Sequence, residues 1–181
     1  MRALPERDQQ HMMYGITGTP GTGKSSVGEE LSSRGYTVVR LTETTEPYRL
    51  ERDEERDTVV IDEESWASEF SPVEGFVEGH LAHLLPCDLI VVLRCRPDVL
   101  ADRLMRRGYP GAKVRENAEA EAIDLILIEC LEGFEARQIY ELDTTDKSVL
   151  ECSDMIEMFV RGEIPPSFGE IDWSDYLGTS L

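Results

Sequence analysis

Residues 18–25 read Gly-Thr-Pro-Gly-Thr-Gly-Lys-Ser, and this stretch is the most informative feature of the chain for predicting its fold. It fits the pattern G-x-x-x-x-G-K-[ST], in which glycines let consecutive backbone N–H groups curl around an anionic phosphate. In such a loop Lys24 reaches the β and γ oxygens of a nucleotide, and the Ser25 hydroxyl ligates Mg²⁺. An apolar run at 12–16 precedes the stretch and a helical pattern follows it. Because the motif requires this strand–loop–helix context, the residues predict a phosphate-binding loop.

Strand-like and helix-like segments alternate along the rest of the chain. Strands are expected at 12–16, 36–40, 58–61, 75–78, 88–93 and 137–142, and helices at 24–34, 62–70, 97–107, 114–134 and 148–161. The run 89–93 is apolar without alternation, as parallel strands covered on both faces are. The pattern therefore predicts an α/β fold, with a mostly parallel sheet sandwiched by helices that binds ligands at the carboxyl ends of its strands.

The length of 181 residues indicates one domain with a full core. We expect the polar residues 1–11 to form a disordered extension and residues 12–163 to form the phosphate-loop domain. Residues 164–181 are expected to be an irregular tail. Within the domain, the polar and acidic segment 41–57 suits a mobile flap, and a short lid is expected at about 107–115.

The chain carries 37 Asp and Glu against 18 Lys and Arg, a formal net charge of −19. This balance argues against nucleic acid as the main partner, because no surplus of basic side chains is present to displace its counterions. A basic protein partner fits the charge. Salt adaptation, in which a high net charge keeps the surface solvated, fits it as well.

Three further features of the sequence indicate the cellular compartment of the protein. No run of about eighteen apolar residues is present to span a membrane, and the opening residues lack the apolar core of a signal peptide. The four cysteines form no C-x-x-C pair, so free thiols in a reducing compartment are expected. We therefore expect a cytoplasmic protein.

Basic residues gather at the end of the predicted helix 97–107 and just beyond it: Arg103, Arg106, Arg107, Lys113 and Arg115. Phosphoryl transfer requires positive charge around oxygens that become more negative in the transition state. The cluster therefore predicts a basic lid that closes over the nucleotide. A solvated helix end, where arginines favour the helix dipole, accounts for the same cluster.

Glu78 and His80 stand at the carboxyl end of the predicted strand 75–78. A carboxylate there would hold the water shell of Mg²⁺, and the imidazole would orient or deprotonate a water. A surface turn is the alternative interpretation. A metal site built on His80 and His83 is rejected, because the sequence has no further Cys or His cluster to complete its ligands.

The segment 143–147 follows the last predicted strand directly. Its place at a strand end would bring it beside the phosphate loop, where it would cradle the purine of the nucleotide. The alternative is a plain helix cap, with Thr145 or Asp146 before Ser148.

Together these motifs resemble the archaeal and nuclear adenylate-kinase-like proteins. The resemblance is carried by ITGTPGTGKS at 16–25, EGHLAH at 78–83, VLR at 92–94, RGY at 107–109, KVREN at 113–117 and DTTDK at 143–147. It extends over nearly the whole chain from Met12, and the motifs are specific as a set. It implies a P-loop NTPase fold of the nucleoside monophosphate kinase type with a short lid, in a family that couples this fold to small-subunit ribosome maturation.

The resemblance also implies roles for individual residues. It assigns ATP contact to Gly21, Gly23, Lys24, Ser25 and Ser26, contact from the lid to Arg107, and contact on the adenine side to Lys147. An acid-x-His element, linked in the family to metal, water and ATP hydrolysis, falls at Glu78 and His80. The expected catalytic residues are thus Lys24, Arg107, Glu78 and His80, and the expected Mg²⁺ ligands are Ser25 and Glu78.

Two departures from the family pattern matter. The family usually has Asp where this chain has Glu78, which lengthens the reach to Mg²⁺ by one methylene. The segment 41–57 also lacks a clear counterpart of the arginine by which ordinary adenylate kinases grip the acceptor monophosphate. Arg40 and Arg49 are the candidates for that contact.

The leading hypothesis is a nucleoside monophosphate kinase that transfers the γ-phosphoryl group of ATP to AMP, with a slower ATPase activity. The resemblance adds a role in small ribosomal subunit maturation, including rRNA processing, with a basic ribosomal protein of the platform as partner. One alternative is an ATP-dependent assembly factor whose kinase turnover is incidental. Another is a different small phosphate-loop kinase that acts on a metabolite.

Overall fold

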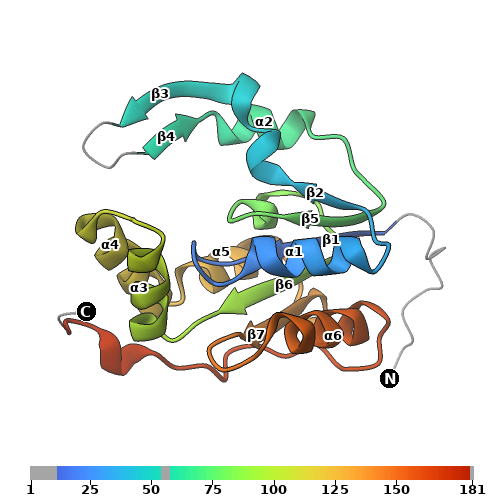
Figure 1. Ribbon diagram of the computed structural model, residues 1–181. Coiled ribbons are helices and arrows are strands. Elements are labelled where there is room, and N and C mark those ends of the chain that lie inside the picture. Colours follow the sequence, from blue (N-terminus) through green and yellow to red (C-terminus); the bar gives the residue numbers. More distant parts are fainter. Residues whose placement is uncertain (1–11, 54–57, 180–181) are drawn as a thin grey trace.

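The computed structural model describes residues 12–53 and 58–179, and its centre is a five-stranded parallel sheet (Figure 1). The strand order is β2-β5-β1-β6-β7. The strands are β1 (Met13–Thr17), β2 (Val38–Arg40), β5 (Gly75–Glu78), β6 (Leu89–Arg94) and β7 (Ile139–Asp143). The predicted α/β sandwich is confirmed. The extension expected at 1–11 lies outside the described residues.

One face of the sheet is covered by α1 (Lys24–Ser33) and α6 (Val149–Val160). The apolar side chains that meet there come from the strands (Ile16, Phe76, Val91, Leu142) and from the two helices (Val27, Leu31, Ile156, Phe159). The apolar pattern of α6, with Ile156 and Phe159 one turn apart, gives that helix its buried stripe.

The other face is covered by α2 (Glu63–Glu69) and α5 (Leu125–Gly133), together with the short turn η4 (Ala82–Leu84). Their buried residues pack on the sheet: Trp66, Ala82, Leu127 and Cys130 against Val77, Ile90 and Val92. Because successive strand residues point to opposite faces, the uninterrupted apolar run of β6 serves both layers of the core.

The segment expected as a mobile flap contains regular structure in its described part. The turns η2 (Leu41–Glu43) and η3 (Glu46–Tyr48) lead into β3 (Arg49–Asp53). This strand pairs antiparallel with β4 (Thr58–Ile61) in a hairpin outside the main sheet. Leu41 is buried in the core, whereas Leu50 is exposed. A two-stranded ribbon outside the main sheet needs few buried apolar residues, so the polar composition of this segment does not indicate that it contains strands.

The prediction of one helix over 114–134 is wrong. The segment forms α4 (Gly111–Ala122) and α5, which are separated at Asp124, a residue with φ of 57°. The guanidinium of Arg94 donates to the Asp124 carboxylate and to the Glu121 carbonyl oxygen. This buried charge holds the turn that interrupts the helix. α4 also begins at Gly111, before the start expected at 114, so Lys113 lies inside the helix.

The remaining helix and the tail complete one end of the molecule. α3 (Pro97–Arg106) packs on α4 through Leu100, Leu104 and Val114. The tail returns along the outer edge of β7, where Ser167 forms a parallel bridge with Tyr140 and so covers an otherwise open sheet edge. The turn η6 (Ser174–Tyr176) then contacts α4, so the described part of the tail lies beside this helix (Figure 1).

Within the described residues, no helix combines the length and apolar character that a membrane crossing needs.

Candidate nucleotide-binding site

The phosphate loop joins the carboxyl end of β1 to the amino end of α1. Gly18, Gly21 and Gly23 have φ values of 140°, 94° and 104°, which L side chains rarely adopt. A Cβ at Gly18 would also collide with the carbonyl oxygen of Leu93, and one at Gly21 would lie 2.8 Å from a methyl carbon of Leu100. The glycines therefore let the loop lie closely against β6 and α3.

The first turn of α1 opens onto this loop. No side chain caps the helix at Gly23, so the N–H groups of residues 24–26 have no intrahelical acceptor. The helix dipole adds partial positive charge at the same point. Ser25 is exposed and Ser26 is half-buried there. Amides, dipole and hydroxyls together make a site for a phosphate group.

Lys24 is buried within the loop. Its Nζ donates to the carbonyl oxygens of Gly18 at 2.7 Å and of Thr19 at 3.0 Å. Burial lowers the pKa of Lys24 to about 8, against the opposing pull of the Glu78 and Glu121 carboxylates. The ammonium form therefore still predominates at neutral pH, and its charge is concentrated at the loop.

Glu78 ends β5 directly beside Ile16, its partner in β1. The side chain is only 3% exposed, and Oε1 accepts a hydrogen bond from Arg40 Nε at 3.1 Å. Gly28 of α1 gives the carboxylate room, because a Cβ there would lie 3.2 Å from Glu78 Cγ. The longer side chain that departs from the family pattern is thus accommodated by a glycine opposite it.

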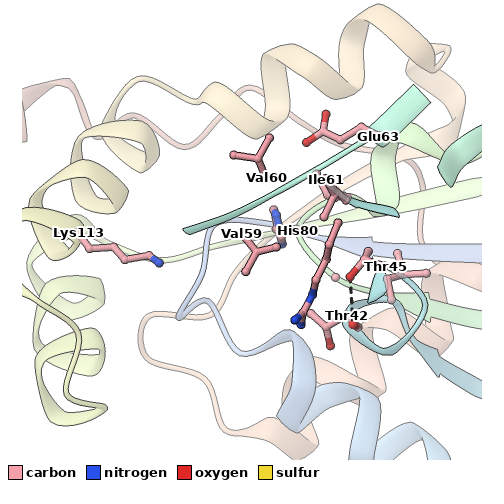
Figure 2. Close-up of a pocket in the computed structure, with 12 residues that line it drawn as sticks. Thr42, Thr45, Val59, Val60, Ile61, Glu63, His80 and Lys113 are labelled. Carbon is pink, nitrogen blue, oxygen red and sulfur yellow. Dashed lines mark hydrogen bonds between the residues drawn. The ribbon is translucent and has the colours of Figure 1, made fainter. Parts of the chain in front are cut away.

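His80 lies two residues after Glu78 and lines the larger of the two cavities described below (Figure 2). The ring borders that cavity, but the surrounding protein removes much of its hydrating water. This loss of hydration disfavours the charged imidazolium and lowers the pKa of His80 to about 4. The positive charge of Lys24 acts in the same direction. The imidazole is therefore neutral at pH 7, as a group that accepts a hydrogen bond or a proton from water must be.

His83 has a different role from His80. Its Nδ1 lies 3.1 Å from Thr17 Oγ1, and its Nε2 lies 3.0 Å from Glu129 Oε2. Both ring nitrogens thus face protein groups, and the ring holds the end of β1 in place. Among the residues that the structure describes, no three His, Cys, Asp or Glu side chains gather to ligate a metal by themselves.

A cavity of about 260 Å³ lies between the phosphate loop, α3 and the segment after β7. It brings together five of the residues expected to contact ATP: Gly21, Gly23, Ser26, Arg107 and Lys147. Arg103 fixes one wall, because its guanidinium donates to the carbonyl oxygens of Thr144 at 3.0 Å and Thr145 at 3.3 Å. Ser25 is adjacent in the sequence but does not line this cavity.

The helix-cap alternative for the segment 143–147 is wrong in its detail. The cap of α6 is Ser148, whose hydroxyl accepts from the N–H of Glu151 in a capping box. Thr145 turns the other way and accepts from the N–H of Arg96 at 2.9 Å. The segment is thereby held against the start of α3, with Thr144 and Lys147 on the wall of the cavity.

The larger cavity, which His80 lines, has a volume of about 490 Å³ and lies between the β3–β4 hairpin and α4. Val59, Val60 and Ile61 of β4 form one wall, and Lys113 reaches toward it from α4 (Figure 2). Of the two candidate arginines, Arg49 lines this cavity. Arg40 is instead paired with Glu29 and Glu78.

Sequence reasoning missed a buried ion network beside the loop. Arg94 is 1% exposed and pairs with Glu121, Asp124 and Glu141. Glu121 in turn accepts a hydrogen bond from Thr19 of the phosphate loop. A charged residue at the end of an apolar strand was the available signal, because a buried charge requires partners.

Comparison with known proteins agrees with this geometry. Residues 15–124 match the family model of an AAA domain. A protein from Archaeoglobus fulgidus named "Putative adenylate kinase" is 46% identical over 170 residues, which cover 92% of this chain and 94% of that protein. A protein of the same name from Natronomonas pharaonis is 40% identical over 169 residues, covering 92% of this chain and all, 100%, of that one.

A solved structure of deoxyadenosine kinase from M. mycoides with bound dATP has the same fold, with a TM-score of 0.56 at 13% identity. The alignment covers 83% of this chain and 100% of that one. Because the two archaeal relatives share well over a third of their residues with this chain along nearly all of its length, the chain belongs to the archaeal adenylate-kinase-like family that its motifs resemble.

Proposed function

We propose that this protein is a nucleoside monophosphate kinase that transfers the γ-phosphoryl group of ATP to AMP. The observation that carries the proposal is the presence of two cavities, each lined by a residue that interacts electrostatically with Lys24. Arg107, which lines the smaller cavity, helps to lower the pKa of Lys24, and Lys24 in turn helps to lower the pKa of His80, which lines the larger one. A donor and an acceptor in these cavities would present their phosphates to the same ammonium group.

On the donor side, the amides of residues 24–26 and Lys24 would hold the phosphates, and Lys147 would lie beside the purine. Ser25 and Glu78 supply a hydroxyl and a carboxylate, the oxygen ligands that Mg²⁺ prefers. Mg²⁺, when bound there with ATP, neutralises part of the phosphate charge. The ammonium of Lys24 would stabilise the charge that grows on the transferred group.

On the acceptor side, the larger cavity combines an apolar wall with cationic side chains. Val59, Val60 and Ile61 would face the base, while Arg49 and Lys113 would attract the monophosphate. Arg49 forms an ion pair with Glu46 at 2.6 Å, and both side chains are more than half exposed. Such an exposed pair is weak, so Arg49 can turn to a phosphate at little cost.

The test is ADP production measured with ATP alone and with each of AMP, GMP, CMP and UMP added. AMP is expected to stimulate ADP formation most. Arg49→Met should raise KM for AMP roughly tenfold or more, since a charge-assisted contact to phosphate is lost, and should leave KM for ATP nearly unchanged. Arg137→Met, a change at an exposed arginine outside both cavities, is the matched control.

Equal ADP formation with and without every monophosphate would contradict the kinase assignment. Turnover restricted to an added metabolite would instead favour another small phosphate-loop kinase. An unchanged KM for AMP in Arg49→Met would assign the phosphate contact elsewhere, with the kinase assignment intact.

Arg107→Ala is expected to slow phosphoryl transfer more than it weakens ATP binding. Arg107 is exposed at the end of α3, and a lid arginine acts mainly when the lid is closed over the transition state. Single-turnover rates and the Kd for ATP measure the two effects separately. Arg106→Ala, at an exposed neighbour that does not line the cavity, is the control. Equal rates in all three proteins would place the lid contact at another residue.

We also propose that the protein acts in the cytoplasm in maturation of the small ribosomal subunit, with a basic ribosomal protein of the platform as partner. The family resemblance and the net charge of −19 support this role. An assembly factor whose ATP state controls release of that partner, with kinase turnover incidental, is the alternative within it. A purified platform protein should be retained by this chain at working salt, in competition with ribosomal RNA. Its complete absence from the pull-down would leave salt adaptation as the explanation of the charge.

A further inference from the structure

Thr19 of the phosphate loop is held through both its backbone and its side chain. Its carbonyl oxygen accepts from Lys24 Nζ at 3.0 Å, from the Thr22 hydroxyl at 2.8 Å and from the Thr22 N–H at 3.2 Å. Its own hydroxyl donates to Glu121 Oε2 at 2.6 Å. Thr19 and Glu121 are each 2% exposed, so water does not compete for this charge-assisted bond.

Glu121 uses both carboxylate oxygens. Oε2 receives the Thr19 hydroxyl, and Oε1 accepts from Arg94 Nε at 2.7 Å and from the Cys95 N–H at 3.0 Å. Arg94 also donates to the Glu121 carbonyl oxygen at 3.0 Å. The carboxylate is thereby fixed to the end of β6 from two directions, and its orientation toward Thr19 is determined.

The position of Glu121 along α4 determines which end of this helix the contact with Thr19 holds. Glu121 lies in the last turn of α4, whereas Lys113 lies in the first turn, next to the larger cavity. The contact with Thr19 therefore fixes the base of the helix whose other end carries basic lid residues.

We infer that Thr19 and Glu121 are positioning residues for phosphoryl transfer, and that their hydrogen bond sets the phosphate loop in register with the lid. The inference rests on the proposed function. Positive charges from the loop and from the lid must meet at the same phosphate oxygens, and a misplacement of about 1 Å can cost roughly a hundredfold in rate. A buried bond between the two elements keeps that error small.

The decisive comparison is between Thr19→Val, which keeps the shape of the side chain but lacks the hydroxyl, and Thr19→Ser, which keeps the hydroxyl. Thr19→Val is expected to lower kcat for AMP-dependent ADP formation about ten- to a hundredfold and ATP affinity only about threefold. Thr19→Ser should remain within about threefold of the wild type in both. Far-UV circular dichroism and Tm establish that each variant is folded.

A double-mutant cycle with Glu121→Gln tests the partner. If the bond is the shared cause, the double variant loses no more kcat than the more impaired single variant. Additive losses would overturn the inference, as would a folded Thr19→Val with wild-type kcat, since that result is what a purely structural bond predicts. Should Glu121→Gln fail to fold, the Thr19 pair of variants still decides.

Failure of the proposed kinase function can be distinguished from failure of the Thr19–Glu121 positioning contact. A wild-type protein that forms no ADP with any monophosphate contradicts the proposed function, and the inference is then judged by equilibrium binding of ATP. Weaker binding by Thr19→Val that Thr19→Ser restores would support the bond as a positioning contact. Equal binding by all three proteins would overturn it.

Discussion

Lys24→Ala is expected to abolish turnover, with a loss in kcat of roughly a thousandfold. The substitution removes the ammonium that follows the β and γ phosphates into the transition state, where the oxygens carry more negative charge than in bound ATP. ATP binding should weaken much less than the rate, because the loop amides and the amino end of α1 remain. Steady-state kinetics together with equilibrium ATP binding separate these two effects.

The control for this experiment has to come from the same position, because the only other lysines, Lys113 and Lys147, line the two cavities. Lys24→Arg keeps the charge but replaces a compact ammonium by a planar guanidinium. Activity in Lys24→Arg above that of Lys24→Ala would assign the effect to charge, and equal loss would assign it to geometry as well. Wild-type rates in Lys24→Ala would end the phosphate-loop interpretation.

The phosphate loop could be predicted from the sequence because its determinants are local. Positive φ at Gly21 and Gly23 and the start of α1 at Lys24 all lie within one short stretch. The strand β6 could be predicted for the same reason, because a strand that is buried on both faces has apolar residues at successive positions.

The ion network could not be predicted, because it joins residues that are far apart in the sequence. Glu121 lies 102 positions from Thr19, in a helix where a glutamate is ordinarily a solvated side chain. The break at Asp124 has the same cause. Helical periodicity runs through it, and only the buried guanidinium of Arg94 shows why the chain turns there.

The choice between Arg40 and Arg49 illustrates the same limit at the acceptor side. Arg40 borders the predicted flap and Arg49 lies within it, and composition does not distinguish them. In the structure β2 directs Arg40 to Glu78, while the hairpin brings Arg49 to the larger cavity. Pairing of β3 with β4 outside the main sheet makes that difference, and the flanking sequence contains no tight-turn signal that would predict it.

Glu78→Ala should damage both transfer and hydrolysis, each by roughly a hundredfold, because both activities need the metal that this carboxylate would position. Glu78→Asp should be tolerated, since it restores the residue usual in the family. The cost to the fold should be small, because Arg40 keeps its second partner, Glu29, at 3.0 Å. ADP formation with and without AMP, measured side by side in these variants, gives the comparison.

His80→Ala should separate the two activities. Hydrolysis without acceptor should fall by roughly a hundredfold, because a water must be oriented there by a side chain, and the neutral imidazole is suited to that role. AMP-dependent ADP formation should fall less, since a bound monophosphate brings its own nucleophilic oxygen. If Glu78 and His80 were merely part of a turn remote from the nucleotide, all three variants would keep near-wild-type values of both activities. A selective loss of hydrolysis in His80→Ala, beside a joint loss in Glu78→Ala, is the pattern that only an acid and an imidazole with distinct duties at one phosphate site would produce.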